Sequence, residues 1–244
     1  MTDGPLSGKS ALVTGGARRI GRAIALELAR AGADVAITTL TSKTEAAETV
    51  RALESLGRRG LAVACDVRLE EQVRAAIAGT VGQFGRLDLV VNNAAVFESA
   101  ELENMSLEQW DAMFATNTRG PFLVAREALP HLRAVSGRIV NIGSLGGIHA
   151  WAGHAHYCSS KAALHMLTLA MAKAFAPEVS VNCVAPGWID MDGSAEGASA
   201  RFAAKTPLKR NGTAEDVARA VLFFAANAGF VTGQILAVDG GLGL

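Results

Sequence analysis

Residues 11–22 decide the fold, and they read ALVTGGARRIGR. An apolar run leads into a glycine turn, and an amphipathic stretch begins at Ile20. A strand that turns sharply into a helix presents unpaired backbone N–H groups and the positive end of the helix dipole. Gly15 and Gly21 let the backbone bend and a ligand approach closely. The stretch therefore predicts an anion site at the carboxyl end of a first strand.

Outward from this turn, short apolar runs alternate with helix-like stretches to the end of the chain. This alternation is typical of a parallel sheet that helices cover on both faces. Ile20, Ile24 and Leu28 lie on one predicted helical face, and capping-box residues stand at 106–109 and 213–216. We predict one α/β domain over residues 1–244, a doubly wound Rossmann fold with strands at 11–14, 35–38, 61–65, 87–91, 138–142, 179–184 and 234–238.

One segment does not follow this alternation. Residues 190–207 are rich in Gly, Ala and Ser, and they predict a long irregular insertion near the substrate. A mobile lid and a plain surface loop are both consistent with this composition.

Composition excludes several classes of protein. With 23 Lys+Arg against 23 Asp+Glu, the net charge is zero, so no basic surface for nucleic acid is expected. The three cysteines form no CxxC pair, which disfavours a disulfide framework and a zinc site, and we expect a cytoplasmic protein without a secretory leader. Residues 220–238 carry no formal charge, but Asn227, Gly229 and Gln234 interrupt them. We therefore expect a helix, a turn and a strand there and no membrane partner.

The residues around the first two strand ends indicate which anion binds. Arg18 and Arg19 face the unfavourable end of a helix dipole unless an anion compensates them, although both would also be stable in water. An NAD site usually ends its second strand with an acid, but Thr39 stands at this position, followed by Thr41 and Ser42. Because no carboxylate would repel a 2′-phosphate, we predict NADP(H) as the cofactor. Thr41 and Ser42 would also serve as a helix N-cap.

A tyrosine and a lysine one helical turn apart suggest proton chemistry. Tyr157 is the only tyrosine, and Lys161 follows it at the start of the helix predicted at 159–175. An ammonium beside a phenol favours phenolate and lowers its pKa toward the working range. Ser144 follows the fifth strand, where a hydroxyl would steady a carbonyl oxygen, although a turn serine is common there.

Together these residues resemble the short-chain dehydrogenase/reductase family over nearly the whole chain. The resemblance implies a seven-stranded doubly wound sheet, a homotetramer, and hydride transfer between a nicotinamide and a carbonyl or alcohol. It rests on Thr14-Gly15-xxx-Arg19-x-Gly21, Asp66-Val67, Asn92-Asn93-Ala94-Ala95, Asn117, Ser144, Tyr157-xxx-Lys161 and Pro186-Gly187.

The resemblance also implies roles. Tyr157 is similar to the general acid, Lys161 to the residue that lowers its pKa and holds the nicotinamide ribose, Ser144 to the group that orients the substrate, and Asn117 to the residue that helps hold a proton-relaying water. Gly120-Pro121 disfavours regular helix beside Asn117. The expected cofactor-binding residues are Gly15, Arg18, Arg19, Ile20, Gly21, Thr39, Thr41, Ser42, Asp66, Val67, Asn93, Ala94, Tyr157, Lys161, Pro186, Gly187 and Ile189.

The chain departs from the family pattern in two places. Arg19 replaces the middle glycine of the turn, which resembles the NADPH-preferring pteridine reductases, but that branch commonly has Asp where this chain has Ser144. Met191 replaces a threonine, so one polar contact to the cofactor is expected to be missing or to be supplied by the backbone.

The loop before Tyr157 is expected to line the substrate pocket with His149, Trp151, His154 and His156, and Trp151 would alternatively be a packing residue. With Cys158 nearby, the histidines suggest a metal, but their spacing fits a strand and not a loop, so we predict none.

These observations lead to one principal function and two alternatives. We expect NADPH-dependent reduction of a small-molecule or carrier-bound carbonyl, with a 3-oxoacyl thioester as one substrate. A pteridine reductase-like activity is the alternative within the same chemistry. A regulator that senses NADP without chemistry is an alternative of another class, but an intact Ser144, Tyr157 and Lys161 set argues against it.

Overall fold

The computed structural model describes residues 4–191, 197–227 and 229–244. Its centre is a seven-stranded sheet in which every neighbouring pair is parallel, in the order β3-β2-β1-β4-β5-β6-β7. This order, with its reversal between β1 and β4, confirms the predicted doubly wound fold. The strands are β1 (Ser10–Val13), β2 (Asp34–Thr39), β3 (Gly60–Ala64), β4 (Leu89–Asn92), β5 (Arg138–Ile142), β6 (Ser180–Pro186) and β7 (Ile235–Val238).

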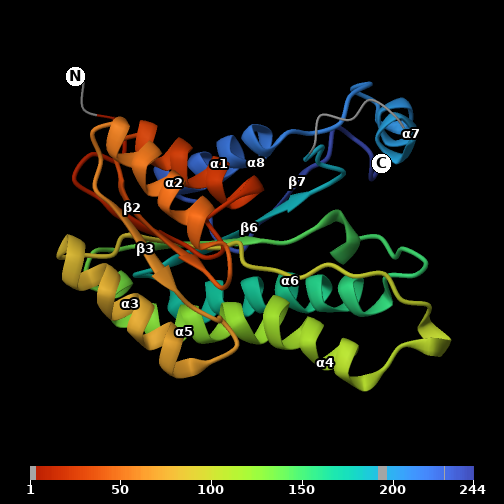
Figure 1. The fold of residues 1–244 in the computed structure, drawn as a ribbon, viewed down its shortest axis with the longest axis horizontal. Coiled ribbons are helices and arrows are strands. Elements are labelled where there is room, and N and C mark those ends of the chain that lie inside the picture. Colours follow the sequence, from red (N-terminus) through yellow and green to blue (C-terminus); the bar gives the residue numbers. More distant parts are fainter. Residues whose placement is uncertain (1–3, 192–196, 228) are drawn as a thin grey trace.

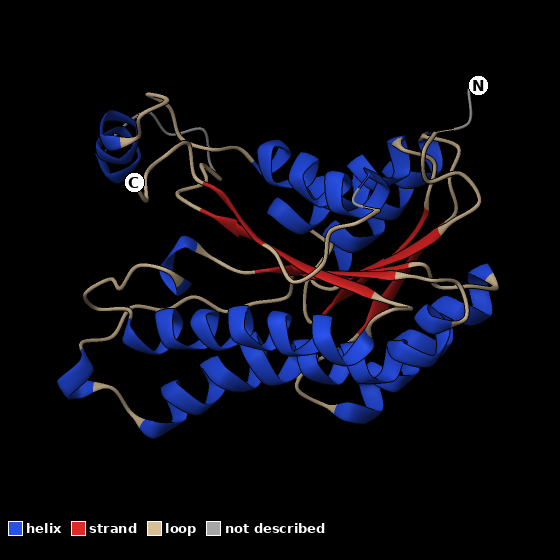
Figure 2. Ribbon diagram, turned by 180° about the vertical axis from the view of Figure 1, so that it is seen from behind, coloured by secondary structure: helices blue, strands red, loops and turns tan. Residues whose placement is uncertain are grey.

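Helices cover both faces of the sheet, as Figures 1 and 2 show. One layer holds α1 (Arg19–Arg30), α2 (Lys43–Ser55) and α8 (Ala214–Leu222). The other holds α3 (Glu70–Phe84), α5 (Gly120–Arg133) and α6 (Ala155–Phe175), with α4 (Leu107–Phe114) packed on α6. Shorter helical segments are the 3-10 turns Leu102–Asn104 and Leu145–Gly147 and the π-helical turns Ala115–Arg119 and Phe223–Asn227.

The strands bury both of their faces. Val13 packs with Ile24 in the core under α1 and α8, whereas its neighbour Leu12 packs with Leu132 in the core under α3 and α5. Successive side chains of a strand point to opposite faces, so a strand between two helical layers needs an uninterrupted apolar run. This is the pattern of the short apolar runs in the sequence.

The capping boxes are confirmed. Ser106 accepts a hydrogen bond from the backbone of Gln109 at the start of α4, and Thr213 accepts one from Asp216 at the start of α8. The uncharged stretch 220–238 contains the end of α8, a π-helical turn and β7, as expected. Among the described residues, no helix has the length and hydropathy needed to cross a membrane.

The predicted irregular insertion at 190–207 is wrong in part. It contains helix α7 (Gly197–Lys205), while residues 192–196 lie outside the described part of the chain. The stacked rings of Trp188 and Phe202, 4.1 Å apart between centroids, help to stabilise this helix. Helix α6 also begins four residues earlier than predicted, so it includes Tyr157.

Candidate active site

The glycine turn after β1 is fixed to the end of β4. Asn93 donates its side-chain amide to the carbonyl oxygens of Thr14 and Gly15 at 2.9 and 3.0 Å. Gly15 has a φ of +63°, and its N–H donates to the hydroxyl of Thr38. A Cβ at Gly21 would collide with the Gly15 carbonyl and the Asn93 amide. The turn therefore requires glycine at both positions.

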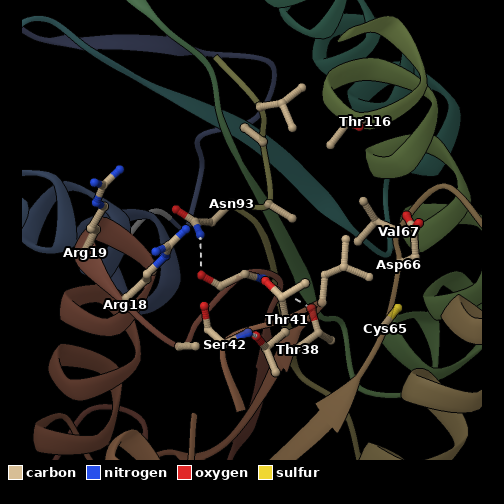
Figure 3. Close-up of a pocket in the computed structure, with 18 of the residues that line it drawn as sticks. Arg18, Arg19, Thr38, Thr41, Ser42, Cys65, Asp66, Val67, Asn93 and Thr116 are labelled. Atoms are coloured by element: carbon tan, nitrogen blue, oxygen red, sulfur yellow. Dashed lines mark hydrogen bonds between the residues drawn. The ribbon is translucent and has the colours of Figure 1, made fainter. Parts of the chain in front are cut away.

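A groove of about 470 Å³ begins at this turn and crosses the ends of β2 and β3 (Figure 3). Its volume lies within the range of small-molecule sites. The structure brings into it the predicted cofactor residues Gly15, Arg18, Arg19, Ile20, Gly21, Thr39, Thr41, Ser42, Asp66, Val67, Asn93 and Ala94. Other residues that line the groove were not predicted from the sequence, among them Thr38, Cys65, Arg68, Val96 and Thr116. Their positions at or just after the ends of strands and in the π-helical turn Ala115–Arg119 were the only signal in the sequence.

The two ends of the groove differ in charge. Figure 3 shows the guanidinium groups of Arg18 and Arg19 on one side and the Asp66 carboxylate on the other. Asp66 accepts hydrogen bonds from the Arg68 side chain at 2.6 to 3.0 Å, and these bonds lower the pKa of its carboxyl group. The two arginines thus lie at the start of α1, whereas the charge of Asp66 is compensated by its ion pair with Arg68.

No acid lines the groove at the end of β2 among the described residues. The Thr39 hydroxyl accepts a hydrogen bond from the Ser42 backbone at 3.1 Å, and Thr41 is exposed. Ser42 occupies the N-cap position of α2, but its side chain makes no capping hydrogen bond to the described helix. Its hydroxyl is therefore not committed to that helix.

Arg19 stands where the family pattern has a glycine, and its backbone adopts a φ of +52°. This left-handed conformation is unfavourable for a residue with a Cβ. The Arg19 side chain is exposed, so burial does not explain why an arginine is found here. Backbone strain of this kind is commonly found at functional sites.

The second set of candidate residues lies at the carboxyl end of β5. Ser144 follows this strand, and its hydroxyl forms a hydrogen bond with Tyr157 of α6. Lys161, one turn further along α6, is 3% exposed and donates its ammonium to the Ile142 carbonyl at 2.8 Å. The ammonium nitrogen lies 5.9 Å from the centroid of the Tyr157 ring. The predicted Ser144, Tyr157 and Lys161 set is therefore brought together.

The pKa values of this set differ from the sequence expectation. Burial raises the pKa of Tyr157, and this effect outweighs the hydrogen bond from Ser144, which lowers it. We expected Lys161 to lower the phenol pKa, but its ammonium is bound to the Ile142 carbonyl. Burial lowers the pKa of Lys161 itself to about 8. In this arrangement the phenol remains protonated at neutral pH.

Asn117 lies in the π-helical turn before Gly120, where an irregular helix was expected. Its side-chain oxygen accepts from the Val96 N–H at 2.9 Å, and its amide donates to the Val96 carbonyl and to the Ser160 hydroxyl. Ser160 in turn donates to the Tyr157 carbonyl at 2.8 Å. Asn117 therefore joins the loop after β4 to the helix that carries Tyr157. Its predicted role toward a water stays a prediction.

Five predicted cofactor residues do not line the groove: Tyr157 and Lys161, which lie beside Ser144, and three residues at or just after the end of β6. Pro186 is buried at the end of β6, Gly187 packs against Asp239, and Ile189 forms an isolated bridge with Gly212. Pro186 ends β6 and the other two follow it, at the same carboxyl edge of the sheet as Ser144. Met191, in contrast, does line the groove.

Aromatic rings surround the Tyr157 ring. Phe97 meets it edge-on at 4.8 Å between centroids, and Trp151 lies nearly parallel to it at 6.1 Å. His154 stacks on Phe97 and shares a 2.8 Å hydrogen bond with Ser99. The expectation that His156 lines the pocket is wrong, because its side chain is fully buried.

The fold and the two sets of residues define an α/β oxidoreductase with a dinucleotide-binding groove. A family model described as enoyl-(acyl carrier protein) reductase matches residues 15–243. The 3-oxoacyl-[acyl-carrier-protein] reductase FabG of Staphylococcus aureus is 38% identical, over 96% of this chain and 98% of that protein. Hydroxynaphthalene reductase arp2 of Aspergillus fumigatus is also 38% identical, over 94% of this chain and 90% of the relative.

Solved structures agree with these sequence relatives. A short-chain dehydrogenase from Burkholderia cenocepacia in complex with NADP superposes with a TM-score of 0.93 at 39% identity, covering 98% of this chain and all of that one. A short-chain dehydrogenase/reductase from Serratia marcescens has a TM-score of 0.93 at 36% identity, with the same coverage. The chain belongs to the short-chain dehydrogenase/reductase family, and it is an NADP(H)-dependent oxidoreductase. The predicted family and cofactor are confirmed.

Proposed function

We propose that the protein reduces a carbonyl group with NADPH, and that Tyr157 donates the proton. The observation that carries this proposal is the hydrogen bond between Ser144 and Tyr157, beside the buried Lys161 and at the same sheet edge as the groove. NADPH, when bound, supplies the hydride that adds to the carbonyl carbon. Ser144 holds the carbonyl oxygen, and Tyr157 transfers its proton to that oxygen, so that an alcohol forms. Lys161 would hold the nicotinamide ribose.

The groove fits this cofactor in shape and charge. The glycine turn leaves room for a pyrophosphate against the N-terminus of α1. Arg18, Thr41 and Ser42 surround the end of β2, where a 2′-phosphate would find a cation and hydroxyl donors. Asp66 and Val67 would contact the adenine, Asn93 and Ala94 the middle of the cofactor, and Pro186, Gly187 and Ile189 the nicotinamide end.

Replacing Arg19 with glycine is expected to raise stability and to weaken NADPH binding at the same time. Glycine adopts a φ of +52° without steric cost, so the free energy of unfolding should rise by about 1 kcal/mol. The loss of one cation at the phosphate site should raise the NADPH dissociation constant about tenfold. Urea unfolding and NADPH fluorescence titration measure the two effects. A less stable variant or an unchanged dissociation constant would contradict the proposed role of Arg19.

We propose a 3-oxoacyl thioester as the first substrate class, because the chain is similar to FabG over nearly its full length. The rings of Phe97 and Trp151 beside Tyr157 favour a second class, a planar ring ketone or a pterin. A panel with acetoacetyl thioester, dihydropteridine and a bicyclic aromatic ketone, monitored by NADPH oxidation, distinguishes the classes.

The same panel tests the aromatic rings directly. If a planar substrate stacks on Trp151, the Trp151→Leu variant should lose about 5- to 10-fold in kcat/KM for the planar substrates. Turnover of acetoacetyl thioester should stay within about twofold, since a flexible chain gains little from a ring face. Equal losses for all substrates would contradict a stacking role.

The assembly and location are also proposals. Phe122 of α5 and Met166 of α6 are exposed, and a groove of about 1020 Å³ between these helices and α4 is lined in part by Phe114 and Leu167. Leu236 is exposed on the edge strand β7. We propose that these two faces join the copies of a homotetramer. Sedimentation velocity would test this by measuring the mass of the assembly in solution. All three cysteines are free, consistent with a cytoplasmic protein.

A further inference from the structure

His165 is a buried histidine that the proposed mechanism does not use. It follows Tyr157 and Lys161 on α6 at the same four-residue spacing, so the three side chains lie along one face of the helix. Its side chain is 5% exposed, and its ring lies against the loop that carries Ser144. A Cβ at Gly147 would lie 2.6 Å from the His165 ring, and a Cβ at Gly143 would collide with it. The two glycines on either side of Ser144 thus leave the space that the ring fills.

The hydrogen bonds of His165 determine its tautomer. The backbone N–H of Ser144 donates to Nε2 at 3.4 Å, so Nε2 carries no proton. The ring also forms a hydrogen bond with the backbone of Gly147, which favours a proton on the ring. Because Gly147 offers its carbonyl oxygen to that proton, Nδ1 is the protonated nitrogen. The neutral ring therefore bridges the first and last parts of the Ser144 loop.

The surroundings keep this ring neutral. Burial and the charge of Lys161 lower the pKa of His165 to about 4. The thiol of Cys183, on β6, faces the same space from below Gly143, and its pKa is raised to about 12. Neither neighbour could offset the charge of an imidazolium, because the Cys183 thiol is neutral and the Lys161 ammonium is itself positive. A protonated Nε2 would place two N–H groups against each other at Ser144.

The orientation of Ser144 depends on this contact. Its hydroxyl accepts a hydrogen bond from the Gly146 N–H at 3.0 Å and forms one with Tyr157. Its backbone N–H is held by His165 at the other end. Because both the backbone N–H and the hydroxyl of Ser144 are held by hydrogen bonds, the hydroxyl has a single orientation. Loss of the ring would free the backbone end of Ser144 and leave a buried N–H without a partner.

We propose that His165 is a positioning residue for carbonyl reduction, which holds the Ser144 loop so that the serine and tyrosine hydroxyls meet one substrate oxygen. This inference rests on the proposed function of Ser144 and Tyr157. His165 touches neither substrate nor cofactor in this proposal, and it acts through Ser144 alone.

The test compares two variants with a control of the same chemical change. His165→Leu fills the space without an acceptor, whereas His165→Gln returns an oxygen near the position of Nε2. We expect His165→Leu to lower kcat about 10- to 100-fold, with the NADPH dissociation constant within about twofold. His165→Gln should recover most of the loss. His131→Leu, on α5, should leave kcat unchanged.

A double-mutant cycle distinguishes positioning from a general structural role. In a Ser144→Ala background, His165→Leu should cause no further loss of kcat, because the hydroxyl it positions is already gone. Independent, multiplicative losses would overturn the proposal, as would a full kcat for His165→Leu.

Failure of this inference is distinguishable from failure of the proposed function. If Tyr157→Phe is inactive and His165→Leu is fully active, only the role of His165 is wrong. If Tyr157→Phe keeps full activity, the proposed proton transfer is wrong, and the His165 proposal fails with it.

Discussion

Replacing Tyr157 with phenylalanine is expected to lower kcat by a factor of about 10² to 10⁴ for any carbonyl substrate. The phenol is the proton donor of the proposed reaction, and burial keeps its pKa raised, so it is protonated before the reaction. Phenylalanine keeps the ring contacts with Phe97 and Trp151 but has no proton to give. Steady-state NADPH oxidation on the substrate panel measures the loss.

Binding of NADPH provides the control for this variant. Tyr157→Phe should keep its NADPH dissociation constant within a few fold, because the groove from Gly15 to Asp66 is unchanged. Such a result separates lost chemistry from lost binding. A variant that turns over at the wild-type rate would refute the proton-donor role. If instead the wild-type protein is inactive on every substrate of the panel, the regulator that senses NADP becomes the better explanation.

Thr39→Asp is expected to reverse the cofactor preference. The new carboxylate would stand at the end of β2, beside the hydroxyls of Thr41 and Ser42, where the 2′-phosphate is proposed to bind. Repulsion between the two anions should raise the NADPH dissociation constant about 10- to 100-fold. The same carboxylate would accept hydrogen bonds from the ribose of NADH, whose dissociation constant should fall.

The local structure allows a charge to be placed at position 39 without the loss of an existing hydrogen bond. Thr39 accepts a hydrogen bond from the Ser42 backbone at 3.1 Å, and an aspartate oxygen offers the same acceptor. Thr39→Asn is the matched control, because it has nearly the shape of aspartate without its charge. Isothermal titration with both cofactors measures the preference of the three proteins. Unchanged selectivity in Thr39→Asp, or an equal shift in Thr39→Asn, would exclude charge at this position as the cause.

Much of this molecule was predictable from local patterns. The seven strands, the two capping boxes and the glycine turn depend on residues that are close in sequence, and each has a characteristic spacing. The cofactor preference was also predictable, since it depends on charges within a few residues of two strand ends. The doubly wound order followed because parallel strands with helical connections have few alternatives.

The errors have a common physical cause. The insertion at 190–207 contains α7, which is stabilised by the contact of Trp188 with Phe202, and no local signal indicated it. His156 was expected to line the substrate pocket from a loop, but α6 begins earlier and buries it. The pKa of Tyr157 depends on what covers the ring and on where the Lys161 ammonium points. Composition and spacing carry no information on either.

The sequence by itself determined the class of fold, the nucleotide groove and the residues that lie one helical turn apart, because backbone periodicity places these from local order alone. Only the tertiary structure decided which groups meet across the chain. His165 reaches the Ser144 loop from 21 residues away, and Asn117 joins the loop at Val96 to the helix of Tyr157. Such contacts depend on how buried side chains fill shared space, and that packing is settled only when the helices lie on the sheet.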